Sequence, residues 1–81
     1  MTNRAKLEHC FRDTLGLPAT AAVDHLRYQD DPAWNSLGHM RLVSALETQF
    51  SISFTTEEIL DMNSYAKAAE LLEKHGVDLT A

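Results

Sequence analysis

The stretch that decides this fold is Pro32-Ala33-Trp34-Asn35-Ser36-Leu37-Gly38-His39-Met40-Arg41-Leu42-Val43. Proline fixes its own φ and disfavours helix in the residue before it, so the chain turns here. Asn35 is among the best N-cap residues, because its side-chain oxygen accepts a backbone N–H of the first helical turn. The stretch therefore predicts a helix whose first residue, Ser36, holds its hydroxyl near the surface at a rigid start.

The helix that begins at Ser36 is expected to run to about Phe50. Two apolar rows follow it, one of Leu42, Leu46 and Phe50 at spacing four and one of Leu37, Met40 and Val43 at spacing three. Together they form a face wider than one neighbour covers, which is typical of the central helix of a bundle. We expect Leu37 and Met40 to line a groove near Ser36, although all six residues would also serve as ordinary core.

A first helix is expected over residues 3–15. Its apolar face holds Leu7, Phe11 and Leu15, four residues apart, with Cys10 beside them. Gly16 stands where glycine usually ends a helix. Cys10 is interpreted as a small buried apolar residue, because no cluster of bases near it would favour a reactive thiol.

The next residues, 17–35, read as a long loop with two prolines and several acidic side chains. Loops of this length in small domains are usually functional or partly ordered. Val23, Leu26 and Tyr28 are expected to hold the loop on the core, and a short helical turn around Ala21–Leu26 fits the pattern. Trp34 is most simply a packing anchor.

Two more helices are expected after Phe50. Thr55 and Glu58 fit a capping box, which begins a short helix ending near Met62. A last helix covers about residues 65–75, with apolar residues on its inner side and Gly76 at its end. The residues after Gly76 are expected to fray.

Residues 34–42 resemble the phosphopantetheine attachment motif of acyl carrier proteins, which is usually read as Asp-Ser-Leu. The resemblance continues through Leu46, Glu47, Phe50, Ile52 and residues 54–59, and it covers most of the chain from Leu7 to Leu72. The serine falls where the family places it, but Asn35 stands where the family usually has aspartate. The resemblance implies an all-α fold, a small four-helix bundle of acyl-carrier-protein type with a long first loop and a short third helix, in a single domain of residues 1–81.

The resemblance also implies a function. Ser36 would carry a covalent 4′-phosphopantetheine arm from coenzyme A, with Asn35 and Leu37 beside the attachment point. The arm would hold acyl or aminoacyl groups as thioesters for a dedicated lipid, polyketide or secondary-metabolite pathway. The implied partners are a phosphopantetheinyl transferase, an acyl or aminoacyl ligase, and synthase or transferase enzymes. The apolar cargo would find shelter between the second and third helices, near Leu37, Met40, Phe54 and Ile59.

Partner enzymes are expected to dock on the second and third helices. The candidate surface consists of His39, Met40, Arg41, Glu47, Glu57, Glu58 and Asp61. The last three project outward in this interpretation, either as a docking patch for a basic partner or merely as a solvated face. The second helix is less acidic than in many carrier proteins that resemble this chain, so the identity of the partners stays open.

Composition and charge exclude several classes of protein. The 81 residues allow one domain with a small core, and such a domain buries only about 60 % of its unfolded surface. The net charge of −5 argues against nucleic acid, whose phosphates would repel the chain. Residues 1–29 hold four basic and three acidic side chains, whereas residues 30–81 hold three basic and nine acidic ones. This acidic latter part suits a partner with a basic surface.

The single cysteine permits no disulfide within the chain, and no apolar run reaches the length of a membrane span. The first residues also lack the apolar run of a signal peptide. From these absences we expect a cytoplasmic monomer that does not bind a membrane.

No catalytic residue and no metal site are predicted. Ser36 lacks the Gly-x-Ser-x-Gly setting of a hydrolase nucleophile. The histidines, His9, His25, His39 and His75, show no spacing typical of metal ligands. His39, three residues after Ser36, is interpreted as an exposed helix residue that touches the arm or a partner, in preference to a general base. The chain is therefore not expected to be an enzyme.

A second interpretation belongs to another class of protein. The chain would then keep the carrier fold as a helical interaction module but hold no arm, and Asn35 is the residue that favours it. The two interpretations differ in whether Ser36 is ever modified.

Overall fold

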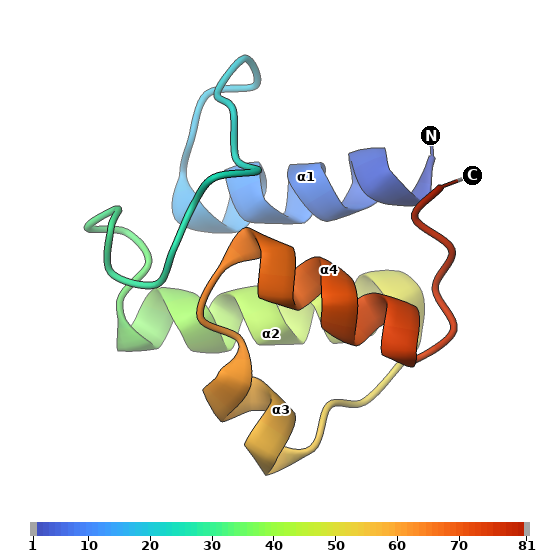
Figure 1. The fold of residues 1–81 in the computed structure, drawn as a ribbon. Helices are drawn as coiled ribbons and strands as arrows, with labels where there is room; N and C mark the ends of the chain where they lie inside the picture. Colours follow the sequence, from blue (N-terminus) through green and yellow to red (C-terminus); the bar gives the residue numbers. More distant parts are fainter. Residues whose placement is uncertain (1, 81) are drawn as a thin grey trace.

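The helix that starts at Ser36 packs along the first helix of the chain in the computed structural model, which describes residues 2–80. The helices are α1 (Asn3–Leu15), α2 (Ser36–Phe50), α3 (Thr56–Asp61) and α4 (Tyr65–Lys74), and the described residues contain no strand (Figure 1). The predicted all-α class is confirmed. The predicted helix bounds agree with the observed ones to within one residue.

Each helix begins at a residue whose side chain accepts a backbone N–H. The caps are Thr2 for α1, Asn35 for α2, Thr55 for α3 and Ser64 for α4. The capping box predicted for α3 is present, since the Thr55 and Glu58 side chains each accept the other residue's N–H. These bonds satisfy donors that have no partner within the helix, so the local sequence accounts for where the helices start.

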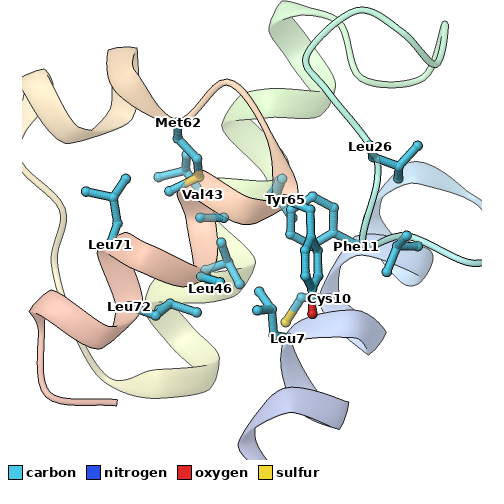
Figure 2. Packing of buried hydrophobic residues seen from close by; sticks show 14 of the residues in the cluster. Leu7, Cys10, Phe11, Leu26, Val43, Leu46, Met62, Tyr65, Leu71 and Leu72 are labelled. Atoms are coloured by element: carbon cyan, nitrogen blue, oxygen red, sulfur yellow. The ribbon is translucent and has the colours of Figure 1, made fainter. Parts of the chain in front are cut away.

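One hydrophobic core joins α1, α2 and α4 with the long first loop (Figure 2). Its largest fully buried side chains are Trp34, Phe11, Leu7, Leu42, Leu46, Met62, Leu72 and Val23. Cys10 is a buried free thiol, as predicted, and burial raises its pKa, with a further contribution from Asp13. On α2, Leu42, Val43 and Leu46 are core residues, Phe50 is half-buried, and Leu37 and Met40 are exposed.

The first loop, residues 16–35, contains turns and no helix. Where a short helical turn fitted the pattern of Ala21–Leu26, the loop has a single hydrogen-bonded turn, in which Leu26 N donates to Val23 O at 3.1 Å. Val23 and Leu26 are buried, which confirms that they hold the loop on the core. Backbone hydrogen bonds also join the loop to the chain that leads from α3 into the first residue of α4. Tyr65 N donates to Leu26 O at 2.9 Å, and Tyr28 N donates to Asn63 O at 2.8 Å. Backbone bonds to a distant segment therefore order a loop that has no regular structure of its own.

The prediction that the chain frays after Gly76 is wrong within the described residues. Leu79 is buried, and Val77 packs against the core. The Asn3 side chain donates to Asp78 O at 2.9 Å, which brings the two ends of the described chain together (Figure 1). Burial of an apolar side chain outweighs the entropy that the tail would keep if it were free.

Gly38 allows the turn before α2 to fold back onto the first turn of the helix. A Cβ built on Gly38 would overlap the carbonyl oxygen of Ala33, which is backbone. Two hydrogen bonds to Asp31 stabilise this turn. The Asp31 side chain accepts from Ala33 N, and the Asp31 carbonyl accepts from Trp34 N. A side chain at position 38 would therefore push the loop away from the start of α2.

Replacement of Gly38 by alanine tests this close approach. In an ordinary helix this change stabilises by about 1 kcal/mol. Here we expect Gly38→Ala to lower the free energy of unfolding by about 1–3 kcal/mol, because the added methyl group is overpacked against backbone. Urea denaturation measures the change, and Ser44→Ala, at an exposed position of the same helix, is the matched control. A Gly38→Ala variant as stable as the parent would contradict the predicted overlap.

Candidate functional site

Ser36 is the first residue of α2, and its side chain is exposed. The Asn35 side-chain oxygen accepts from Gly38 N at 2.9 Å, so the predicted N-cap is confirmed. A capped first turn holds the backbone of Ser36 in place while leaving its hydroxyl accessible. The site is thus a hydroxyl at a rigid helix start.

Trp34 anchors the turn that leads into the site. Its side chain is fully buried, and its ring meets the Phe11 ring edge-on with centroids 5.3 Å apart. The predicted role of Trp34 as a packing anchor is confirmed. Edge-to-face aromatic contacts add to the area buried, so Trp34 joins the loop firmly to α1.

His39 bridges this turn to α3. Its Nδ1 lies 3.0 Å from Trp34 Nε1, and its Nε2 lies 2.8 Å from the carbonyl oxygen of Ile59. An indole N–H only donates, so Nδ1 is the acceptor and Nε2 carries the proton that Ile59 O accepts. The prediction that His39 is an exposed helix residue is therefore wrong, because these two bonds hold its ring half-buried.

The hydrogen bonds of His39 also limit the chemistry of the site. Both ring nitrogens are engaged, one by Trp34 and one by Ile59, so neither is placed to take a proton from Ser36. Within residues 2–80, no group of three or more histidine, cysteine or acidic side chains is arranged to hold a metal ion. The Ser36 hydroxyl is therefore exposed at the start of α2, and His39 is not its general base.

Tyr28 is the residue that sequence reasoning missed. Its phenol oxygen lies 3.2 Å from Ser36 Oγ, within hydrogen-bond distance. The sequence placed Tyr28 only as one of three residues that hold the loop on the core. No local pattern pairs a residue in the loop with one eight positions later, so the contact depends on the tertiary path of the loop.

A small hollow of about 140 Å³ lies beside Tyr28 on the α3 side. Its lining residues are Tyr28, His39, Ile59, Leu60, Met62 and Asn63. Of the four residues proposed for a shelter between α2 and α3, only Ile59 lines this hollow.

The other three residues proposed for the shelter lie elsewhere. Met40 lines an open groove of about 760 Å³ between α1 and α2, together with His9 and Arg41. Phe54 is buried, and its ring meets that of His75 edge-on. Leu37 is 60 % exposed beside Ser36. The apolar side chains Leu37 and Met40 are thus surface residues near the start of α2, available to a partner.

The candidate docking residues divide into exposed and engaged ones. Met40, Arg41, Glu57 and Asp61 are exposed. Glu47 is half-buried, and its carboxylate accepts from Phe54 N at 2.8 Å. This bond holds the segment after α2 against the helix. The groove beside Glu57 and Asp61 also contains Lys67 and Lys74, which offset part of the acidic charge.

Glu58 does not project outward as predicted. Its side chain is buried, accepts from Thr55 N at 2.8 Å, and lies 3.0 Å from His75 Nε2. Lys74 Nζ lies 3.6 Å from the same carboxylate. The residue is therefore a structural link between α3 and the end of α4, because its capping role turns the side chain inward.

These partners change the acidity of Glu58. The hydrogen bond from Thr55 N, followed by that from His75, lowers the pKa of Glu58 from 4.5 to about 2. A carboxylate that accepts hydrogen bonds favours its charged form. The Glu58 carboxylate is thus ionised throughout the neutral and mildly acidic range.

Comparison of the sequence with protein-family models and with curated proteins found no match in either case. Among the described helices, none is both long and apolar enough to cross a bilayer.

The lowered pKa of Glu58 predicts how stability depends on pH. Because the pKa of Glu58 is lower in the folded state than in the unfolded one, its carboxylate stabilises the fold. This contribution is complete above about pH 4.5 and is lost as the pH falls toward 2. We expect Glu58→Gln to be less stable than the parent near pH 6. The difference between the two free energies of unfolding should shrink steadily below about pH 4. Urea denaturation across this range measures it.

The neighbouring change Glu57→Gln is the control, since Glu57 is exposed on the same helix. Its difference from the parent should depend much less on pH. Equal pH dependence of the two variants would show that the link through Glu58 does not stabilise the fold.

Proposed function

We propose that this chain is an acyl carrier protein, which carries acyl or aminoacyl groups on a 4′-phosphopantetheine arm attached to Ser36. The observation that supports this most directly is the exposed hydroxyl of Ser36 at the first position of a capped α2. The serine lies in a stretch that resembles the attachment motif of that family. A long first loop and a short α3 also agree with a bundle of the acyl-carrier type.

The residues around Ser36 fit such an arm. The phosphodiester would lie at the start of a helix of 15 residues, where the backbone dipole favours negative charge. Asn35 adds no negative charge beside it. Leu37 is exposed next to the serine, and the hollow beside Tyr28 lies on the α3 side. Together these side chains offer apolar and uncharged surface to the first atoms of the arm.

Attachment needs little from the chain itself. Ser36 Oγ would attack the phosphorus that bears the pantetheine group of coenzyme A, forming an oxygen–phosphorus bond. The pyrophosphate bond of coenzyme A breaks, adenosine bisphosphate leaves, and the serine proton passes to a base of the phosphopantetheinyl transferase. Mg²⁺ would serve the transferase. The chain's own contribution is to hold Oγ exposed and oriented.

The chemistry of cargo carriage comes from the terminal thiol of the arm, which holds the acyl or aminoacyl group as a thioester. The domain presents the attachment point, and its exposed Leu37, Met40, Glu57 and Asp61 offer a small mixed surface to ligases, synthases and transferases. Small polar interfaces bind weakly and release quickly, which suits a carrier that visits several enzymes. We propose a cytoplasmic monomer in a dedicated lipid, polyketide or secondary-metabolite pathway.

Covalent loading tests the proposal. The purified chain is incubated with coenzyme A, Mg²⁺ and a phosphopantetheinyl transferase of broad specificity, and its intact mass is measured before and after. We expect a gain of one phosphopantetheinyl group, mapped by peptide analysis to Ser36. Ser36→Ala should keep the fold and lose the gain completely, because the side chain is exposed and alanine removes only its hydroxyl.

Loading that persists in Ser36→Ala would remove the assignment to this residue. A parent chain that gains no mass with several transferases would favour the alternative function, a helical interaction module that holds no arm.

The residue before the serine predicts the rate of loading. Asn35→Asp keeps the N-cap but adds a negative charge beside the helix start and the attachment point. If the transferase docks through basic residues, loading of Asn35→Asp should be faster, at least about twofold at low salt, and the advantage should fall as salt screens the charge. Initial rates with matched amounts of transferase measure it. Equal rates with several transferases would contradict the role assigned to Asn35.

A further inference from the structure

The contact between Tyr28 and Ser36 lies at the oxygen that would react in the proposed attachment. The phenol oxygen is 3.2 Å from Ser36 Oγ, and either group can be the donor in the unmodified chain. Both residues belong to surface segments, one in the first loop and one at the start of α2. A hydrogen bond between two surface hydroxyls persists only where the backbone and rings hold both in place.

Tyr28 is held in place on several sides. Its backbone N–H donates to Asn63 O at 2.8 Å. Its ring is edge-on to that of His39, with centroids 5.3 Å apart, and edge-on to that of Trp34 at 6.2 Å. The next residue, Gln29, has a φ of 70°, and its N–H donates to Trp34 O, so the loop turns back beside the ring. The phenol group is therefore a fixed feature of the site.

We propose that Tyr28 binds the phosphodiester of the group carried on Ser36, an inference that rests on the proposed carrier function. Once Ser36 Oγ is esterified it has no proton to donate, and a phosphodiester at neutral pH has only acceptors. Tyr28 is then the donor. The Tyr28 hydroxyl then donates to a non-bridging, anionic oxygen of the phosphodiester. Hydrogen bonds to an ionised acceptor are shorter and stronger than neutral ones.

The neighbouring His39 leaves this role to Tyr28. Both nitrogens of His39 are already bonded, to Trp34 and to Ile59, so His39 has no free N–H for the phosphate. The Asn35 oxygen accepts from Gly38 N, and an amide oxygen is no donor to a phosphate; the Asn35 amide N–H groups lie on the other branch of the side chain. The phenol also lines the hollow on the α3 side. A phosphodiester held by Tyr28 therefore directs the start of the arm toward α3 and away from the groove between α1 and α2.

Removal of one hydroxyl tests the proposal. Tyr28→Phe keeps the ring and its aromatic neighbours, whereas Tyr65→Phe, the matched control, removes the hydroxyl that accepts from Arg4 of α1. All three chains are loaded with 4′-phosphopantetheine, loading is checked by intact mass, and the ³¹P spectrum of the phosphodiester is recorded. We expect the resonance to move in Tyr28→Phe and to stay at the parent position in Tyr65→Phe.

A thermodynamic cycle of folding equilibria, with and without the arm, gives a second test. Tyr28→Phe should lower the folding equilibrium constant in both forms, and the loss should be about threefold larger in the loaded chain, because the lost bond is then charge-assisted. Tyr65→Phe should show the same loss with and without the arm. In the unmutated chain, loading should also shift the ring resonances of Tyr28 in the proton spectrum, so one test needs no variant.

The outcomes separate the two claims. If Ser36 is loaded but the ³¹P resonance, the folding cycle and the Tyr28 ring signals are unchanged, Tyr28 does not bind the phosphodiester and the carrier function stands. If no mass is gained at Ser36 in the parent, the carrier function itself fails.

Discussion

The contacts of the buried Trp34 indole are those on which the site depends. The indole packs edge-on against Phe11 of α1, while its N–H donates to His39, whose other nitrogen reaches the backbone of α3 at Ile59. One side chain thus fixes the long loop, the start of α2 and the position of α3 relative to one another. Because the indole is fully buried, its N–H needs a partner, and His39 supplies one that a surface water cannot replace without opening the core.

The short helix α3 needs support from outside its own sequence. It has six residues, fewer than an isolated helix requires to be stable in water. The capping box at Thr55 and Glu58 starts it, and the same carboxylate binds His75 beyond α4. His39 holds its other end through Ile59 O. The hollow beside Tyr28 and Ile59 is therefore bounded by an element that tertiary contacts keep in place.

The proposed function places different demands on different parts of this domain. The attachment point must be fixed, and the cap, the close approach at Gly38 and the anchor at Trp34 supply that rigidity. Partners must be recognised by what remains exposed, including Leu37 and Met40 beside the serine and the acidic Glu57 and Asp61 on α3. The inward turn of Glu58 and the bond of Glu47 to Phe54 N make the acidic part of that surface smaller than composition alone suggested.

The sequence by itself determined the four helices, the caps at Asn35 and Thr55 and the place of Ser36, because caps, helix-ending glycines and apolar spacing act over three or four residues. It also predicted that Trp34 is a packing anchor and that Cys10 is buried. Only the tertiary structure decided that Glu58 turns inward, that His39 links the loop to α3, that Leu79 is buried and that Tyr28 reaches Ser36. Those outcomes depend on segments far apart in the chain. Their side chains are polar or stand outside any periodic pattern, so no local rule states which partner the folded backbone will bring to each.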